Sequence, residues 1–165
     1  MRTVLAFVLL ASAAWASDEL FDAARKGDVT AVKSALDKGA DINAKWRYDQ
    51  TALFIATFHG RADVVKLLLD RGADPNVKDK FYGMTLLDAA TNKNSIEIMK
   101  MLIDKGAEIT EGFLVGAAQE GASDVLKLAL QKRKWSDEAL TKALAAAEKA
   151  QKSDTAEILR RERAK

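Results

Sequence analysis

Glycines recur along this chain at a nearly constant interval, and that interval restricts the folds open to it. Gly27 and Gly60 are 33 residues apart, as are Gly39 and Gly72, whereas Gly72 and Gly106 are 34 apart. The text around the second glycine of each unit also recurs, as LDKGADIN at 36–43, LDRGADPN at 69–76 and IDKGAEIT at 103–110. A period of this length indicates stacked supersecondary units that bury their apolar faces against one another. We therefore expect a repeat protein whose function is to bind a partner.

Each unit combines two short helices with an extended segment. In the second unit, residues 51–58 place apolar side chains at helical spacing, and Gly60 follows where a left-handed C-terminal residue is least costly. A second apolar stretch, residues 64–69, ends at Gly72, and Pro75 prevents further helix. Isolated helices of this length are marginal in water, so each pair must pack on the next.

These motifs resemble those of ankyrin-repeat proteins, whose unit of about 33 residues is a β-turn followed by two antiparallel helices. The match is closest at residues 49–60, 62–76 and 83–90, and it covers about residues 18–130. The resemblance implies an all-α solenoid of stacked helix-turn-helix units, with short β-hairpin-like tips and a C-terminal helical cap. The family's Thr-Pro-Leu-His sequence is replaced by TALF at 51–54 and TLLD at 85–88, which leaves the role of its histidine open.

The chain is expected to contain three segments. Residues 1–16 have the basic start, apolar run and small-residue end of a secretory signal peptide, and the run is shorter than the ~20 residues that span a bilayer. We expect cleavage after Ala16 and export, to a bacterial periplasm in the first place and to the medium as the alternative. Residues 17–134 are expected to form an ankyrin-repeat domain of about four repeats, with a shortened tip near residues 110–112.

Residues 135–165 read as a C-terminal helical capping segment. Ser136 is expected to cap one helix, and a final helix beginning near Ser153 or Asp154 is expected to bury Ile158 and Leu159. A basic run at 132–134 precedes Trp135; it is interpreted as a solvated helix end, with contact to an acidic partner or phospholipid heads as the alternative.

The composition argues against catalysis and against several classes of partner. The chain has one histidine, His59, no cysteine and no phosphate-binding glycine loop, so we expect no enzyme, no cofactor and no metal site. Cleavage after Ala16 leaves 25 basic and 24 acidic residues, and this balance predicts no nucleic-acid partner. We also expect a monomer with no membrane partner once the signal peptide is removed.

The extended tips are the expected binding region. Proteins of the resembled family bind through these tips and through the exposed face of each first helix, which here maps to Ile55, Phe58, His59, Ala89, Asn92 and Lys93. The tips at residues 45–49 and 78–83 hold aromatic and basic residues, the types enriched at binding hot spots. The alternative is that the rings pack on neighbouring repeats. The predicted partner-binding residues are Trp46, Arg47, Tyr48, Phe58, His59, Lys80, Phe81 and Tyr82.

The sequence therefore predicts a non-enzymatic protein–protein interaction module of the bacterial cell envelope. Three narrower hypotheses stay open: an inhibitor or immunity-type factor, a chaperone-like support for an exported enzyme, and a secreted effector that binds a host protein. The fold alone does not choose among them, because one scaffold serves unrelated functions.

Overall fold

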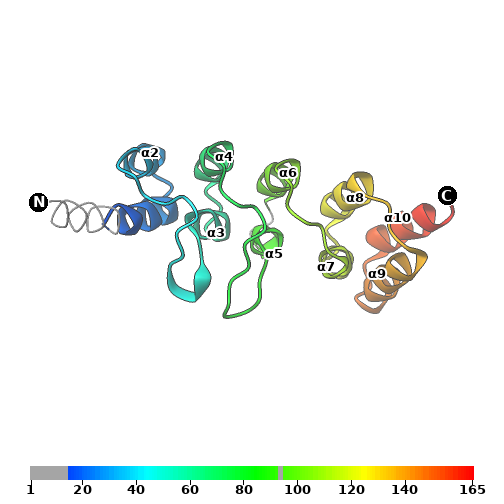
Figure 1. The fold of residues 1–165 in the computed structure, drawn as a ribbon. Coiled ribbons are helices and arrows are strands. Elements are labelled where there is room, and N and C mark those ends of the chain that lie inside the picture. The colour runs from blue at the N-terminus through cyan, green and yellow to red at the C-terminus, as the bar shows by residue number, and fades with distance from the viewer. Residues whose placement is uncertain (1–14, 93–94) are drawn as a thin grey trace, which may run out of the picture. The chain divides into compact units, whose positions relative to one another are not determined.

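Helices are the only regular elements in the part of the chain that the computed structural model describes, residues 15–92 and 95–165, apart from one antiparallel bridge between Lys78 and Thr85 (Figure 1). The predicted all-α class is confirmed. The expected signal peptide, residues 1–16, lies almost wholly outside the described residues. The chain forms two compact units: an N-terminal unit that ends at Ala107 and a C-terminal unit, Glu108–Lys165.

The N-terminal unit consists of paired helices in two layers. Residues 15–26 are helical, and the following elements are α2 (Val29–Asp37), the 3₁₀ turn η1 (Arg47–Asp49), α3 (Ala52–Phe58), α4 (Ala62–Asp70), α5 (Leu86–Asn92) and α6 (Ile96–Asp104). Helix α3 packs on α4 and α5, while α4 packs on α2 and α6, so first and second helices form separate layers (Figure 1). The two long loops before α3 and α5 extend from the layer of first helices.

The C-terminal unit contains two further helix pairs, α7 (Glu111–Glu120) with α8 (Ser123–Lys132) and α9 (Asp137–Lys149) with α10 (Ser153–Arg163). Helix α9 packs on α7, and α10 packs on α8. The last pair therefore packs on the preceding pair, first helix on first helix and second on second.

Hydroxyl side chains cap the first helices. Thr51 Oγ1 accepts a hydrogen bond from the amide of Phe54 at 3.2 Å, and the Oγ atoms of Thr110 and Ser136 do the same for α7 and α9. The cap predicted at Ser136 is confirmed. At α5, the Asp88 carboxylate accepts bonds from the Thr85 hydroxyl at 2.7 Å and amide at 2.9 Å. An aspartate thus stands at the position of the histidine in the resembled family and bonds to the first residue of the TLLD sequence.

The recurring GADxN sequence is explained by contacts between repeats. The Asn43 side chain accepts a hydrogen bond from the amide of Asp74 at 3.0 Å, and the Asn76 side chain donates one to the carbonyl of Gly106 at 3.1 Å. Each asparagine therefore ties its own turn to the corresponding turn of the next repeat. The glycines of these turns adopt the predicted left-handed backbone, with φ of 89° at Gly72.

The core agrees with the prediction except at the end of the chain. Leu159 is fully buried, but Ile158 is only half-buried, so the prediction that α10 buries both residues was wrong for Ile158. Neighbouring residues on a helix differ in direction by about 100°, and α10 turns Leu159 toward its neighbours. Within the described residues, no helix is long and apolar enough to cross a membrane.

Candidate interaction surface

The two tips are closed by equivalent backbone hydrogen bonds but differ in length by one residue. The amide of Trp46 donates to the carbonyl of Gln50 at 2.8 Å, and the amide of Asp79 donates to the carbonyl of Met84 at 3.0 Å. Three residues lie inside the first closure and four inside the second. This extra residue accounts for the change in the glycine interval from 33 to 34.

The second tip is organised by a buried carboxylate. Asp79 is only 3% exposed, and its Oδ1 accepts hydrogen bonds from the amides of Tyr82 at 3.2 Å and Met84 at 2.9 Å. Because hydrogen bonds to a charged acceptor are stronger than neutral ones, these bonds fix the loop backbone. The ring of Tyr82 then projects outward from a constrained loop.

The two tips are joined into one surface through Lys80. Its amide donates to the carbonyl of Tyr48 at 2.8 Å, and its Nζ lies 2.9 Å from the carboxylate of Asp49. Lys45 lies 3.3 Å from the same carboxylate. The hydrogen bond from Lys80, followed by that from Lys45, lowers the pKa of Asp49, and burial opposes this shift. Lys80 therefore holds the tips together and is not a free cation, which the sequence did not reveal.

Three aromatic rings of the tips form an exposed cluster. The Tyr48 and Phe81 ring centroids are 4.9 Å apart, and those of Phe81 and Tyr82 are 4.4 Å apart. The three residues are 56%, 58% and 76% exposed. We call Tyr48, Phe81 and Tyr82 the aromatic cluster. Contiguous exposed rings of this kind mark interaction sites in soluble proteins.

The first tip stores backbone strain beneath this cluster. Tyr48 and Asp49 have φ of 57° and 58°, in the left-handed region that costs an L-residue roughly 1–2 kcal/mol. Such strain persists only where surrounding contacts impose it, and it concentrates at functional sites. Here the contacts to Lys80 hold both residues in place.

Trp46 has a different environment from the other tip rings. It is half-buried, its ring lies 6.1 Å from that of Phe21, and the guanidinium carbons of Arg25 and Arg47 each lie 5.3 Å from its centroid. The alternative interpretation, in which a tip ring packs on a neighbouring repeat, therefore describes Trp46. Its contacts fasten the first tip to the helix at residues 15–26.

The structure separates Phe58 and His59 from the tips. Phe58 is the last residue of α3 and His59 follows it, whereas the beginning of this helix, which is about 10 Å long, adjoins the first tip. Phe58 is 41% exposed and stacks on Phe54 at 6.5 Å, with His59 against its edge at 5.6 Å. These two residues thus form a separate patch.

Two of the predicted helix-face positions were wrong. Ile55 is 4% exposed and Ala89 is fully buried, because α3 packs on α4 and α5, and α5 packs on α3 and α6. Lys93 lies outside the described residues, as does the side chain of Asn92.

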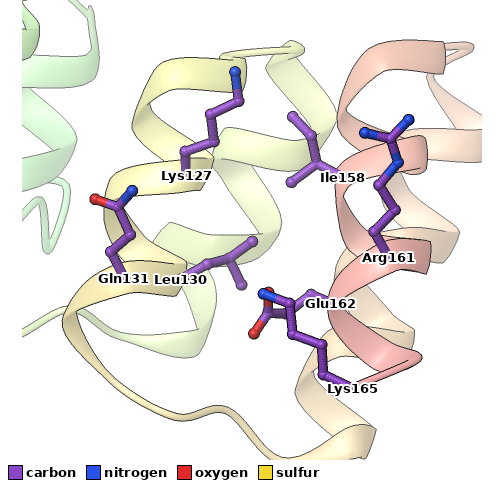
Figure 2. A pocket seen from close by; sticks show the side chains of 7 residues that line it. All are labelled: Lys127, Leu130, Gln131, Ile158, Arg161, Glu162 and Lys165. Atoms are coloured by element: carbon purple, nitrogen blue, oxygen red, sulfur yellow. The ribbon is translucent and has the colours of Figure 1, made fainter.

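A second candidate surface lies between α8 and α10 of the C-terminal unit. Leu130 and Ile158 point into a groove of about 350 Å³ (Figure 2). Its rim carries Lys127 and Gln131 from α8 and Arg161, Glu162 and Lys165 from the other side. Arg161 and Lys165 are paired with Glu157 and Glu162. Sequence reasoning missed this groove because it assigned Ile158 to the core.

Within the basic run before Trp135, Arg133 makes contacts that stabilise the fold. An Arg133 nitrogen donates to the carbonyl of Ile109 at 3.1 Å, and its guanidinium carbon lies 4.2 Å from the Trp135 ring centroid. The Trp135 indole donates to the carbonyl of Ala129 at 3.1 Å. These contacts fasten the connection between α8 and α9.

Comparison with known proteins is consistent with this architecture. A family model described as ankyrin repeats in three copies matches residues 20–112, which are 93 of the 165 residues. No curated protein matches the chain. Among the residues described by the structure, no group of three or more histidine, cysteine, aspartate or glutamate residues is arranged to hold a metal ion.

Proposed function

The chain belongs to the ankyrin-repeat family, and we propose that it binds a partner protein through the aromatic cluster on its joined tips. Ankyrin repeats are generally protein–protein interaction modules, and proteins built from them are typically non-enzymatic. The observation that carries the proposal is the mutual contact of three highly exposed rings on two hydrogen-bonded loops. A monomeric protein gains nothing in stability by exposing such a cluster to water.

Rigid presentation is the proposed binding mechanism. The Asp79 carboxylate and the bonds made by Lys80 hold the tips in one conformation before a partner arrives. Binding then loses little conformational entropy at the loops, and more of the interaction energy appears as affinity. Tyrosine suits this role, since it offers a large contact area with few rotatable bonds.

We further propose that the protein acts in the cell envelope after export. Support comes from the signal-peptide pattern of residues 1–16. Leu20, Phe21, Ala23 and Ala24 are buried and would be kept after cleavage, whereas the buried Ala16 would be removed. Intact-mass measurement of protein from a periplasmic extract is expected to give a chain that begins at Ser17. An uncleaved chain in the cytoplasm would contradict export.

The proposal is tested by in-cell cross-linking of tagged wild type and of a triple-ring variant, Tyr48→Ala/Phe81→Ala/Tyr82→Ala. The variant is expected to keep its helical content and melting temperature and to lose one specific partner. A matched control replaces three exposed residues of second helices, Lys33→Ala/Lys100→Ala/Asp124→Ala, and is expected to retain that partner. Identical captures by wild type and a folded triple-ring variant would contradict the proposal.

The captured partner would also separate the narrower roles. An inhibitor or immunity-type factor is expected to reduce the partner's activity, and a chaperone-like support factor is expected to raise its yield. A secreted effector is expected in the culture medium with a host protein as its partner. Each role is read from the same complex.

A further inference from the structure

The two tips together carry more basic than acidic residues. Residues 45–49 and 78–83 contain four basic and two acidic residues, an excess of two positive charges. The whole chain has 26 basic and 24 acidic residues, so the remaining 154 residues carry 22 of each and are balanced. The six charged tip residues are Lys45, Arg47, Asp49, Lys78, Asp79 and Lys80. The aromatic cluster is thus accompanied by an excess of two positive charges within the tips.

The tip charges fall into engaged and available groups. Lys45 and Lys80 share the carboxylate of Asp49, and the carboxylate of Asp79 is buried beneath two amide donors. Arg47 and Lys78 are exposed, the Arg47 guanidinium carbon lies 5.3 Å from the Trp46 ring centroid, and neither residue forms an ion pair with any residue in the described ranges. One cation in each tip therefore remains for an incoming carboxylate.

From this arrangement we infer that the partner segment recognised by the tips is an acidic peptide segment that places an apolar side chain against the aromatic cluster. The inference rests on the proposed function and specifies its partner chemistry. The apolar side chain would be buried by Tyr48, Phe81 and Tyr82, while flanking carboxylates would meet Arg47 and Lys78. Complementary charge at the rim of an apolar contact speeds association and excludes wrongly charged partners.

The ring geometry favours such a segment over single-stranded nucleic acid, which also binds aromatic and basic surfaces. Successive bases stack on aromatic faces along a positively charged groove. Here the planes of Phe81 and Tyr82 are at 84° and those of Tyr48 and Phe81 at 55°, so adjacent rings do not offer a parallel series. Crossed rings instead offer both faces and edges, against which an aliphatic side chain can pack.

The test uses a phage-displayed library of random peptides, selected on the mature wild-type protein and counter-selected on the triple-ring variant. The surviving peptides are expected to contain an aliphatic or aromatic residue flanked by aspartate or glutamate. An Arg47→Glu/Lys78→Glu variant is expected to weaken the best peptide by about tenfold or more. Binding is also expected to weaken at about 1 M NaCl, where the Debye length is about 3 Å.

Lys33→Glu/Lys100→Glu is the matched control, because it changes the net charge equally on exposed second-helix positions. Circular dichroism and melting verify that each variant is folded. Tip-dependent peptides without acidic residues, or unchanged affinity in Arg47→Glu/Lys78→Glu, would overturn the inference and leave the proposed function standing. Tight, tip-dependent binding of oligothymidine would overturn the inference in favour of nucleic acid. A selection that yields no tip-dependent peptide would count against both proposals.

Discussion

The connections between helix pairs differ in the two units of this protein. In the N-terminal unit, 14 residues connect α2 to α3 and 15 connect α4 to α5, whereas four residues connect α8 to α9 in the C-terminal unit. The first helix of each pair is shorter in the N-terminal unit and longer in the C-terminal unit. It has seven residues in α3 and in α5, ten in α7 and 13 in α9. The N-terminal unit therefore has long tips and short first helices, whereas the C-terminal unit has a short connection between its helix pairs and long first helices.

Exposed apolar residues are also distributed unequally between the two units. Every large hydrophobic residue found exposed among those described, from Trp15 to Tyr82, belongs to the N-terminal unit. In the C-terminal unit, Leu130 and Ile158 are half-buried in a groove whose rim is largely ion-paired. The comparison indicates that stacking needs only the helix pairs, and that the tips are additions suited to recognition.

The largest expected effect tests whether the last helix pair is part of the C-terminal core. Leu159→Ala is expected to lower the free energy of unfolding by about 2–5 kcal/mol, because Leu159 is fully buried. Ile158→Ala, one residue away on the groove floor, is expected to cost less than half as much. Urea unfolding followed by circular dichroism measures both. Equal losses would contradict the difference in burial.

The next effect concerns the scaffold of the second tip. Asp79→Ala leaves two amides without their acceptor and is expected to cost about 2 kcal/mol of stability, with loss of partner binding. Asp79→Asn keeps an acceptor oxygen and is expected to retain most of the stability and most of the partner binding. Asp49→Ala, which removes only surface ion pairs, is expected to cost less stability than Asp79→Ala. A greater cost for Asp49→Ala would indicate that the tips support the fold.

Features set by short stretches of chain could be predicted from the sequence. The helix cap at Ser136 and the left-handed turn at Gly72 each depend on a few neighbouring residues, and both predictions were confirmed. Features set by packing could not be predicted in the same way. The burial of Ile55 and Ala89 depends on which helices pack against α3 and α5. The spacing of apolar residues within one helix does not contain that information.

The candidate surface was predicted in its composition and not in its geometry. The aromatic and basic character of both tips is visible in the sequence. The joining of the tips depends on the amide of Lys80 reaching the carbonyl of Tyr48, with Tyr48 itself in a left-handed conformation that a bulky residue rarely adopts. The packing of Trp46 on Phe21 likewise joins residues of different repeats.

A smaller effect compares the turns that close the two helix pairs of the C-terminal unit. Gly121 has φ of 75°, and Gln151 at the corresponding turn has φ of 57°. Gln151→Gly is expected to raise stability by about 1 kcal/mol through relief of left-handed strain. Gly121→Gln is expected to lower it, since an added Cβ would lie 2.9 Å from the Lys152 side chain. Thermal melts of both variants test this, and shifts in the same direction would contradict it.

A comparison between buried threonines of the two units is expected to give smaller changes of opposite sign. Thr57 Oγ1 is buried without a hydrogen-bond partner within the described structure, whereas the Thr155 hydroxyl donates to the carbonyl of Ala118 at 2.9 Å. Thr57→Val is expected to stabilise, and Thr155→Val to destabilise, by about 0.5–1 kcal/mol each. Urea unfolding of the two variants measures this difference. Destabilisation by Thr57→Val would show that its hydroxyl is satisfied.

The smallest effect is electrostatic and reports directly on contact between the tips. Lys80 lowers the pKa of Asp49 in the folded protein, so the pair's contribution is present above the unfolded pKa of this carboxyl and is lost as pH falls through the folded value. Lys80→Met is expected to raise the pKa of Asp49 toward its ordinary value, as measured by an NMR pH titration. An unchanged pKa would mean that the Lys80 side chain does not contact Asp49 in solution.

Site-specific photo-cross-linking tests the central claim most directly. A photoreactive amino acid is placed at Tyr82 in the aromatic cluster or at Gln131 on the rim of the C-terminal groove, and the cells are irradiated. The account predicts one discrete adduct with a partner protein from position 82 and none from position 131. An adduct from position 131 alone would contradict it, since the binding surface would then lie in the unit without tips.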